Sequence, residues 1–379
     1  MNYNEESIKL HKEHRGKIEL GLKVSLDTKD DLSIAYTPGV AAVCQEIAQD
    51  KFKVNILTNR ASQVAIVTDG TAILGLGDIG PEAGLPVMEG KAAIFKKFAN
   101  IDAIPMCIAT KNVDEIVDFI KNIQPTFAGI NLEDISAPRC FEITRRLEDE
   151  LDVPFFHDDQ DGTAIVVLGG LINAAKVLNK DLKNQKILIN GAGAAGLAIA
   201  RLLLNYGIKD IVVLDSKGVI TEDRNDLNEF KKAFLKDLDI KSQNGDLQFA
   251  IKERDIFIGV SKAGVLTKDM VSSMNENPII FAMANPVPEI MPEEAYLAGA
   301  GIVGTGRSDF ANQINNALVF PGLFKGLLKN NIKKVTMDIK LAVAQAIASS
   351  VEPEKDKLLP LITENKVLDM IVQAIDDLV

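Results

Sequence analysis

The sequence of 379 residues has few cysteines, no long apolar run and no excess of basic residues, and each absence narrows what the protein can be. The three cysteines, Cys44, Cys107 and Cys140, are odd in number and scattered among apolar neighbours, which predicts buried thiols instead of disulfides or a zinc site. The longest weakly polar run, TAIVVLGGLINAAKVL, contains Asn173 and Lys176 and is shorter than the roughly 20 residues that a bilayer span requires. We therefore expect no membrane helix.

The formal net charge of −11 disfavours nucleic acids and anionic membranes as partners, because both bind basic surfaces. The charged start, MNYNEESIKLHKEHRGKIEL, lacks the pattern of a secretory signal, so the expected location is the cytoplasm. The expected partner is a small molecule. An acidic metabolite is compatible with this charge if local cations or a metal reverse the field inside one pocket.

Strand and helix patterns alternate along the chain, and its length favours two compact units. The runs QVAIVTDG, AIPMCIAT, TFAGINLED and VPFFHDD predict strands of a parallel sheet, with helices between them. A second series begins at KILIN and continues through DIVVLDS, DIFIGV, PIIFAMANP and GIVGTG. The predicted fold is α/β with two domains: a parallel-sheet catalytic domain at 1–157, completed by C-terminal helices at 316–379, and a Rossmann-like, doubly wound NAD-binding domain at 158–315.

The stretch KILINGAGAAGLAIARLL places the pattern G-x-G-x-x-G between a strand and a helix, which is the context of a dinucleotide-binding turn. Such glycines allow a tight turn and a close approach of the pyrophosphate to the N-terminus of a helix. Asp215 ends the next strand, where a carboxylate binds the ribose hydroxyls of NAD; Ser216 and Lys217 follow it and leave NADP possible. The polar segment 222–248 receives no chemical role. The predicted cofactor residues of this turn and strand are Gly191, Ala192, Gly193, Ala194, Ala195, Gly196 and Asp215.

Two predicted strands of the first series end in pairs of acids, Glu133 with Asp134 and Asp158 with Asp159. If these strands are neighbours in one parallel sheet, their ends lie about 5 Å apart. Four carboxylates in one crevice repel one another unless they are protonated or hold a cation, and oxygen ligands favour Mg²⁺ or Mn²⁺. Each pair alone is also typical of a helix cap or an exposed turn.

Several motifs in order resemble those of the malic enzymes, specifically the short bacterial kind. They are SIAYTPGVA, VTDGTAILGLGDIG, GLPVMEGKAAIF, NLEDISAP, FHDDQDGTAIVVLGGLI, FAMANPVPE and NQINNALVFPG, and together they cover about residues 20–330. The resemblance implies oxidative decarboxylation of L-malate to pyruvate and CO₂, with NAD or NADP and a divalent metal, in a homodimer. It further implies that Glu133, Asp134 and Asp159 hold the metal.

The catalytic residues implied by the resemblance are Tyr36 as general acid, Lys91 as general base, and Asp158 as the group that orients a catalytic side chain. Lys91 is expected at the start of a helix, where a lysine is normally exposed to solvent. Beside a bound cation its pKa is expected to fall, as a base near neutral pH requires. Residues implied to touch substrate or nicotinamide are Lys91, Asn285, Asn315 and Asn316; the asparagines also suit helix caps or turns.

The chain departs from the larger malic enzymes where these carry a carboxylate-binding arginine, since Thr71 and Ala72 stand there. Arg307 is the predicted replacement. Asp161 is an acid where a neutral or basic residue is expected. A malate-to-lactate lyase, a hydroxy-acid dehydrogenase without decarboxylation and a non-catalytic nucleotide sensor stay open as alternatives, as does whether Tyr36 and Lys91 serve one chain or two.

Overall fold

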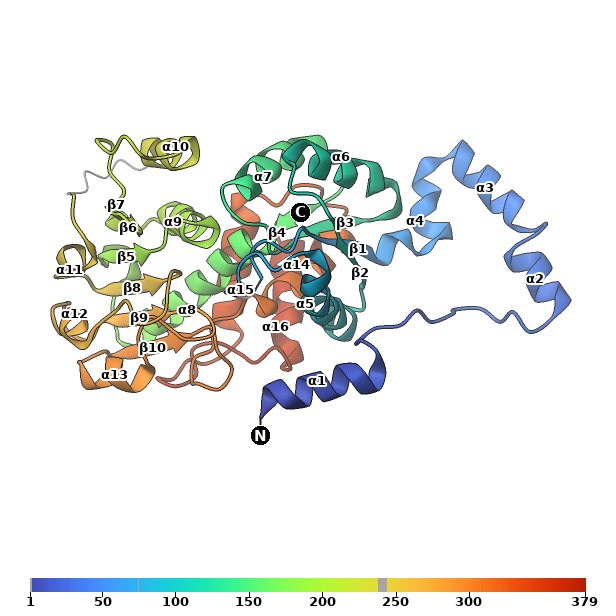
Figure 1. Ribbon diagram of the computed structural model, residues 1–379. Helices are drawn as coiled ribbons and strands as arrows, with labels where there is room; N and C mark the ends of the chain where they lie inside the picture. Colours follow the sequence, from blue (N-terminus) through green and yellow to red (C-terminus); the bar gives the residue numbers. More distant parts are fainter. Residues whose placement is uncertain (1, 74, 238–243) are drawn as a thin grey trace.

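The computed structural model describes residues 2–73, 75–237 and 244–379, and contains two sheets with helices between them and an arm that extends to one side (Figure 1). Residues 238–243 of the predicted polar segment lie outside the described part. Among the described helices none is long and apolar enough to cross a membrane.

The first sheet is parallel, as predicted, with the strand order β2-β1-β3-β4. Its strands read as continuous apolar runs because both faces are buried. Residues such as Ala65 and Ile130 pack on one face against helices α6 and α7, whereas Val64 and Phe156 pack on the other against α5 and α14. The bounds are β1 (Gln63–Thr68), β2 (Asp102–Cys107), β3 (Gly129–Leu132), β4 (Phe155–His157), α5 (Pro81–Ile94), α6 (Val113–Ile123), α7 (Arg139–Glu150) and α14 (Phe320–Lys329).

The second sheet has the order β10-β9-β8-β5-β6-β7, so the chain moves outward from β5 in both directions. This doubly wound arrangement was predicted, except for β7, which pairs antiparallel to β6. The crevice between β5 and β8 is the switch point at which such sheets bind ligands. The strands are β5 (Ile187–Asn190), β6 (Ile211–Asp215), β7 (Gly218–Val219), β8 (Ile256–Gly259), β9 (Ile279–Ala282) and β10 (Ile302–Thr305).

Helices cover both faces of the second sheet. Ile187 and Ile189 face α8 and α9, and Leu188 and Val212 face α11, α12 and α13. Helix α10 lies beside α9, at the edge of β6 and β7 (Figure 1). These helices are α8 (Thr163–Val177), α9 (Ala194–Tyr206), α10 (Glu229–Asp237), α11 (Leu247–Ala250), α12 (Lys268–Ser272) and α13 (Pro292–Leu297).

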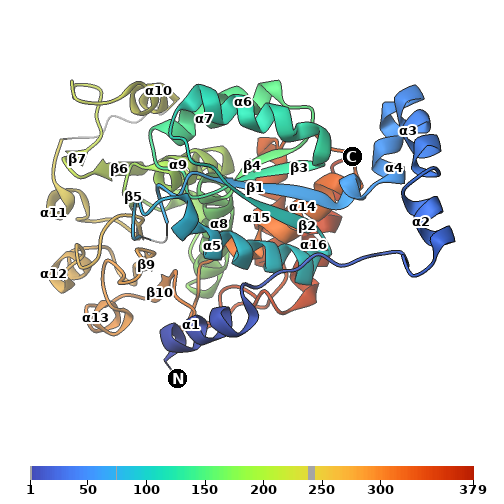
Figure 2. The same ribbon diagram turned by 45° about the vertical axis from the view of Figure 1, so that its right-hand side comes forward.

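The C-terminal segment is helical, as predicted, and returns to the middle of the molecule (Figure 2). Helix α15 (Met337–Ser349) packs on α8 and α9, and α16 (Asn365–Asp376) packs on α14 and α15. Lys340 of α15 forms an ion pair with Asp161 at 2.8 Å, with both side chains largely buried. The unexpected acid at position 161 therefore has a partner from the C-terminal helices.

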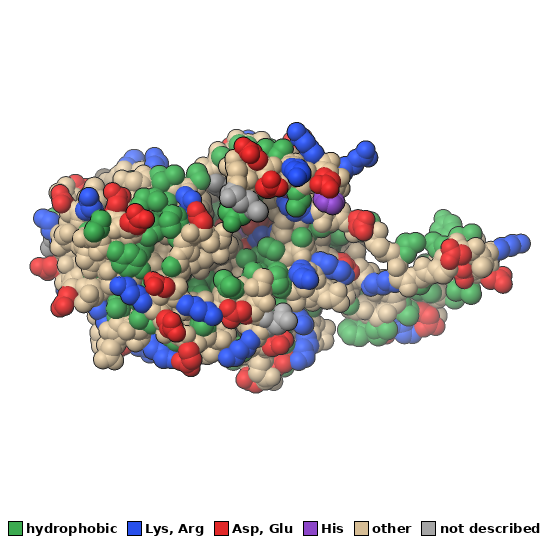
Figure 3. Space-filling view, turned by 90° about the horizontal axis from the view of Figure 1, so that it is seen from below, with side chains coloured by type: hydrophobic (Ala, Val, Ile, Leu, Met, Phe, Trp, Pro, Cys, Tyr) green, Lys and Arg blue, Asp and Glu red, His purple; other side chains and the backbone are tan. Residues whose placement is uncertain are grey.

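The N-terminal arm, residues 18–58, leaves the body after Lys17, whose ammonium donates to the carbonyl of Pro86 at 2.7 Å. Helices α2, α3 and α4 of the arm contain no buried residue, and hydrophobic side chains gather on its surface (Figure 3). The prediction of three buried thiols is wrong for Cys44, which is exposed on α3 because the short contacts of this helix within the arm bury none of its residues; Cys140 is buried and Cys107 is half-buried. The helices are α1 (Tyr3–His14), α2 (Lys29–Ala35), α3 (Val40–Gln49) and α4 (Val54–Leu57).

Candidate active site

The two acidic pairs meet at the carboxyl edge of the first sheet. Strands β3 and β4 are neighbours, with Leu132 opposite His157, so the residues that follow each strand emerge side by side. Ligand oxygens of Glu133, Asp134 and Asp159 all lie within 4.8 Å of one another. Asp159 also accepts a hydrogen bond from the backbone N–H of Asp134 at 2.7 Å. The structure therefore brings these three predicted metal ligands together.

The charges of this acidic cluster are costly to bury. Burial, followed by repulsion from Asp159 and Glu133, raises the pKa of Asp134 to about 9. Burial is also the main cause that raises the pKa of Glu133 to about 7 and that of Asp159 to about 6. Converging, oxygen-only donors with raised proton affinity fit a hard divalent cation such as Mg²⁺ or Mn²⁺, which would replace the protons.

Lys91 is buried between two of these acids. Its Nζ lies 2.7 Å from Glu133 Oε2 and contacts Asp158 Oδ2, and it stands 4.2 Å from the centre of the Phe320 ring. Burial lowers the pKa of Lys91, but attraction to Asp158 and Glu133 outweighs burial, so the pKa is raised above its ordinary value. The lowered pKa expected beside a cation stays a prediction.

Two expectations about Lys91 are corrected by the structure. The residue does not open a helix but lies in the last turn of α5, which begins at Pro81 and contains Pro86 in its first half. It is also buried instead of exposed, because the helix packs this face against the sheet edge and Phe320.

The position of Asp158, the acid that contacts Lys91, depends on a glycine. A bulkier residue at Gly162 would collide with Asp158, since a Cβ there would stand 1.8 Å from Asp158 Oδ1.

Tyr36 does not join the acidic cluster of its own chain. It follows α2 on the N-terminal arm, and 72% of its surface is exposed. Figures 1 and 2 both place α2 at the far end of the arm, away from the ends of β3 and β4. Sequence adjacency to Pro38 and Gly39 predicted a turn at a cleft edge, but Tyr36 is exposed, and no described residue of the same chain forms the other wall of such a cleft.

The glycine-rich turn has the geometry that a dinucleotide requires. Gly191 has φ 128°, and a Cβ there would stand 2.5 Å from the carbonyl oxygen of Val260, at the switch point. A Cβ at Gly193 would meet no atom within 4 Å, which leaves room for a phosphate, and one at Gly196 would collide with the Gly191 carbonyl at 1.7 Å. Helix α9 starts at Ala194, so Ala194, Ala195 and Gly196 form its first turn and Ala192 precedes it.

The other predicted contact residues lie on segments that follow strands of the second sheet. Asn285 follows β9, and its carbonyl oxygen would be 2.2 Å from a Cβ at Gly75 in the loop after β1, so the two loops touch. Asn316 starts the short helix η7 (Asn316–Leu318), and its Cβ would be 3.3 Å from a Cβ at Gly162. Asn315 caps η7 by accepting a hydrogen bond from the N–H of Ala317 at 2.9 Å. This is the helix-cap role that the sequence indicated as the alternative to substrate binding.

Arg307 is engaged within its own loop. It pairs with Asp309 at 2.6 Å, lies over the Phe310 ring and donates to the carbonyl of Pro286 at 3.0 Å, beside Asn285. Its role as carboxylate anchor stays a prediction.

Two further polar residues were missed by sequence reasoning. Arg139 donates to Asp69 and to Thr71 Oγ1, each at 2.8 Å, and Thr71 lies one residue before Ala72, whose N–H donates to the carbonyl of Asp134. The guanidinium of Arg139, from α7, therefore contacts the loop at the position where the larger malic enzymes are expected to carry their arginine. Glu289 is fully buried and accepts from the N–H groups of Ser261 and Ala284, so it fixes the loop that carries Asn285.

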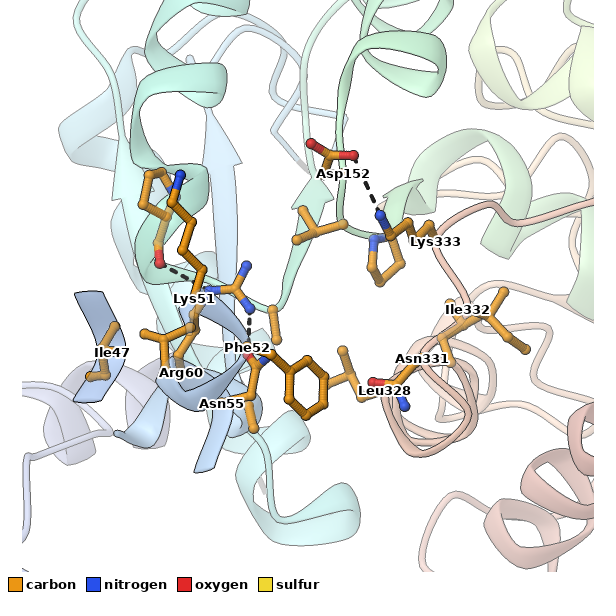
Figure 4. A pocket seen from close by; sticks show the side chains of 17 residues that line it. Ile47, Lys51, Phe52, Asn55, Arg60, Asp152, Leu328, Asn331, Ile332 and Lys333 are labelled. Atoms are coloured by element: carbon orange, nitrogen blue, oxygen red, sulfur yellow. Dashed lines mark hydrogen bonds and ion pairs between the residues drawn. The ribbon is translucent and has the colours of Figure 1, made fainter. Parts of the chain in front are cut away.

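A separate hollow of about 650 Å³ lies at the base of the arm, next to the amino ends of β3 and β4 (Figure 4). Phe52 and Arg60 of the arm side face Leu328 and Lys333 across it, and Lys333 pairs with Asp152 at 3.4 Å. A ligand there would be about 10–15 Å from the acidic cluster, because a four-residue strand separates the two edges. We therefore place the active site at the carboxyl edge.

Comparisons with known proteins agree with this arrangement. Residues 15–148 match the malic enzyme N-terminal domain, and residues 160–375 match the malic enzyme NAD-binding domain. The bifunctional malic/malolactic enzyme of Bacillus subtilis is 51% identical over 379 residues, which cover 99% of this chain and 92% of that protein. The NAD-dependent malic enzyme of Geobacillus stearothermophilus is 48% identical over 95% of this chain and 76% of its own length.

A solved structure gives the same result. The NAD-dependent malic enzyme of Thermotoga maritima superposes with a TM-score of 0.94 at 44% identity, covering 97% of this chain and 98% of the other. With both domain types matched in order and the glycine turn in place, the chain uses a nicotinamide cofactor. It belongs to the malic enzyme family.

Proposed function

We propose that this protein catalyses the oxidative decarboxylation of L-malate to pyruvate and CO₂, with reduction of a nicotinamide cofactor and a divalent cation held by Glu133, Asp134 and Asp159. The observation that carries the proposal is the burial of Lys91 between Glu133 and Asp158, beside the three converging ligand oxygens. A base next to a cation site, in a chain that also carries a dinucleotide turn, suits oxidation of an alcohol, in which the base takes the hydroxyl proton and the nicotinamide takes hydride from the carbon. Family membership supports the same reaction.

The roles of the residues follow from their positions. Mg²⁺ or Mn²⁺, when bound, supplies Lewis-acid polarisation of the C2 oxygen of the substrate. Lys91 accepts the proton of the C2 hydroxyl while hydride passes from C2 to the nicotinamide, and oxaloacetate results; this role requires the pKa of Lys91 to fall from its raised value in the metal-free protein. Loss of the distal carboxylate as CO₂ gives enolpyruvate, and Tyr36 protonates its C3 to yield pyruvate. Asp158 orients the Lys91 side chain throughout.

The remaining predicted residues complete the two binding sites. The turn Gly191–Gly196 holds the pyrophosphate, with Ala192 and Ala194 exposing their N–H groups. Asn285, which lies on a loop fixed by Glu289, contacts the nicotinamide or substrate. Asn315 or Asn316, together with Arg307, binds the substrate from the opposite side. In this proposal the catalytic domain spans 1–157 and 316–379, and the cofactor domain spans 158–315.

We propose that the active unit is a homodimer in which Tyr36 enters the site of the partner chain. The arm exposes an apolar surface that water does not favour: Leu20 is 90% and Ile34 is 74% exposed, and α2, α3 and α4 bury nothing. The segment 18–26 also alternates apolar and polar residues as a strand does, yet it pairs with no strand among the described residues. In the proposed dimer a second copy covers these residues and brings the Tyr36 phenol to the acidic cluster of its partner, where no described residue of the same chain places one.

A second candidate reaction is the conversion of malate to lactate without net change of the cofactor. It is favoured by the relative from Bacillus subtilis, whose name includes malolactic activity. In that case pyruvate stays bound and takes back the hydride at C2. The residues are the same, so only the products separate the two reactions.

The decisive experiment is incubation of purified protein with L-malate, Mn²⁺ and either NAD or NADP, following reduced cofactor, pyruvate, CO₂ and lactate together. Equal amounts of reduced cofactor, pyruvate and CO₂ are expected. Lactate without reduced cofactor would support the second candidate, and oxaloacetate without CO₂ would indicate a dehydrogenase that does not decarboxylate. Absence of turnover with bound cofactor would overturn the proposal.

A further inference from the structure

A buried carboxylate held by neutral donors lies at the carboxyl edge of the second sheet. Glu289 has no exposed surface. Its Oε1 accepts from the backbone N–H of Ser261 at 2.9 Å and from the Ser261 hydroxyl at 3.3 Å, and its Oε2 accepts from the N–H of Ala284 at 3.0 Å. Among the residues that the structure describes, these neutral groups are the ones that favour its charge, and none of them is a cation.

The pattern of hydrogen bonds indicates that Glu289 is ionised. Both of its oxygens accept, whereas a protonated carboxyl would need an acceptor for its own hydrogen. The Ser261 hydroxyl accepts from Asn190 Nδ2 at 2.8 Å, which leaves its hydrogen free to donate to Glu289. Burial raises the pKa of Glu289 above its ordinary value, and the N–H donors of Ala284 and Ser261 oppose this rise. The site therefore carries a negative charge that no ion pair of the described chain cancels.

The position of Glu289 belongs to the half of the sheet that faces the nicotinamide end of a dinucleotide. A Cβ on Gly259, the last residue of β8, would stand 2.4 Å from Glu289 Cδ. Ser261 and Ala284 follow β8 and β9, which form one half of the doubly wound sheet together with β10. The other half, β5 to β7, carries the glycine turn. Since each half of such a sheet binds one mononucleotide, the nicotinamide end falls to β8 and β9.

The acid in the other half of the sheet differs from Glu289. Asp215, at the end of β6, pairs with Arg224 at 2.8 Å and with Lys231 at 2.6 Å. The charge of Asp215 is therefore cancelled within the chain, whereas that of Glu289 is available to a bound ligand.

The nicotinamide ring lies within the range of this charge. The oxidised ring carries one positive charge, and the reduced ring is neutral. Asn285, a proposed contact of the nicotinamide or of the substrate beside it, directly follows Ala284, so a group against Asn285 is about 7–10 Å from the Glu289 carboxylate. Opposite unit charges at such a distance, with an effective dielectric constant of about 20, change an affinity by roughly tenfold.

We propose that Glu289 strengthens the binding of the oxidised nicotinamide cofactor relative to the reduced one, by placing an unpaired negative charge near the cationic ring. Glu289 does not touch the cofactor; it is a positioning residue that acts through its charge and through the loops at Ser261 and Ala284. The reduced cofactor lacks this attraction and is released more readily. The inference deepens the proposed function and rests on it only for the contact between Asn285 and the nicotinamide.

The test compares the binding of oxidised and reduced cofactor to the full-length protein without malate or metal, measured by calorimetry with NAD and NADH and with NADP and NADPH. For the pair that wild type binds more tightly, Glu289→Gln is expected to weaken the oxidised form by about tenfold and to leave the reduced form within about threefold, because only the cationic ring loses the attraction. Glu294→Gln, which removes an exposed acid of α13 in the same domain, is the matched control and is expected to leave the ratio of affinities unchanged.

A purely structural role of Glu289 gives a different result. Ser261→Ala removes one hydrogen bond to Glu289 and keeps the charge, so it is expected to change both affinities by the same factor. An equal loss of both forms in Glu289→Gln, or no change in either, would overturn the inference. Glu289→Met, of similar size and without charge, provides the same comparison if circular dichroism shows that Glu289→Gln does not fold. Malate turnover is not part of the readout, so its failure would count against the proposed function alone.

Discussion

The carboxylate of Asp159 accepts the backbone N–H of Asp134 at 2.7 Å, so one side chain both joins the ends of β3 and β4 and faces the proposed cation. Asp134 itself has φ 51°, a left-handed conformation that aspartate tolerates better than most residues. The bond holds the two ligand-bearing loops in register before any cation arrives. The acidic cluster is therefore preorganised. Its carboxylates repel one another, and binding of a cation would relieve this repulsion.

Manganese is expected to stabilise the wild-type protein more than Asp134→Asn. At a concentration 100 times its dissociation constant, a ligand raises the free energy of unfolding by about 2.7 kcal/mol. The variant loses one of three anionic ligands, so we expect its Mn²⁺ affinity, measured by calorimetry, to fall at least about tenfold. Asp149→Asn, which removes an exposed acid paired with Lys334, is the control. Equal Mn²⁺ affinity in Asp134→Asn and wild type would contradict the ligand assignment.

The metal-free protein is expected to lose stability as the pH rises. The pKa values of Glu133 and Asp158, each about 7, and of Asp134, about 9, lie above those of unfolded carboxyls, so the folded state binds more protons. Their contribution is complete below about pH 4 and disappears towards about pH 9. In chelator-treated protein the melting temperature should fall between pH 6 and pH 9. A flatter profile is expected for Asp134→Asn, and identical profiles would refute the assignment.

Lys91→Ala is expected to retain the binding of nicotinamide cofactor and to lose turnover by a factor of about 10² to 10⁴, as for removal of a general base. It is also expected to unfold more easily, because removal of one partner from a buried ion pair typically costs about 3–5 kcal/mol. Lys96→Ala, on the exposed side near the same helix, should leave the rate unchanged. The measurement is malate-dependent cofactor reduction after calorimetric confirmation of cofactor binding.

The strand ends and the glycine turn could be predicted because their signals are local: apolar runs, a fixed glycine spacing, and acids directly after each run. The adjacency of β3 and β4 was only a condition of the sequence argument, and the strand order confirms it. The pairing of Asp215 with Arg224 and Lys231 could not be predicted, because a strand end and a polar loop share no periodicity. Tyr36 could be named from its motif but not placed, since helix α2, which it follows, buries none of its residues against the described part of the chain.

The buried ion pair between Lys340 and Asp161 is expected to stabilise the contact between the C-terminal helices and the rest of the chain. Both side chains are largely buried, and Lys340 also attracts Glu148, whose pKa is raised mainly by burial. Lys340→Ala should therefore lower the free energy of unfolding by about 3 kcal/mol, measured by urea denaturation. Lys334→Ala, in an exposed pair with Asp149, should lower it by less than about 1 kcal/mol. Equal effects would show that burial adds nothing at this contact.

Coexpression of Tyr36→Phe and Lys91→Ala chains tests whether each active site is built from two subunits. Either homodimer is expected to be nearly inactive. In a mixed dimer with exchanged arms, one site pairs the intact Lys91 of one chain with the intact Tyr36 of the other. Random pairing of the two chains then restores about one quarter of the wild-type sites, because half of the dimers are mixed and each has one intact site.

If Tyr36 serves its own chain, both sites of a mixed dimer carry one defect and coexpression restores nothing. Coexpression of Lys91→Ala with Asp134→Asn is the matched control, since both residues belong to the same acidic cluster and should not complement. Turnover near one quarter in the first mixture and near zero in the second would place the phenol in the partner's site. Turnover near zero in both mixtures would indicate that Tyr36 acts in the active site of its own chain. The arm would then have to fold back onto the acidic cluster.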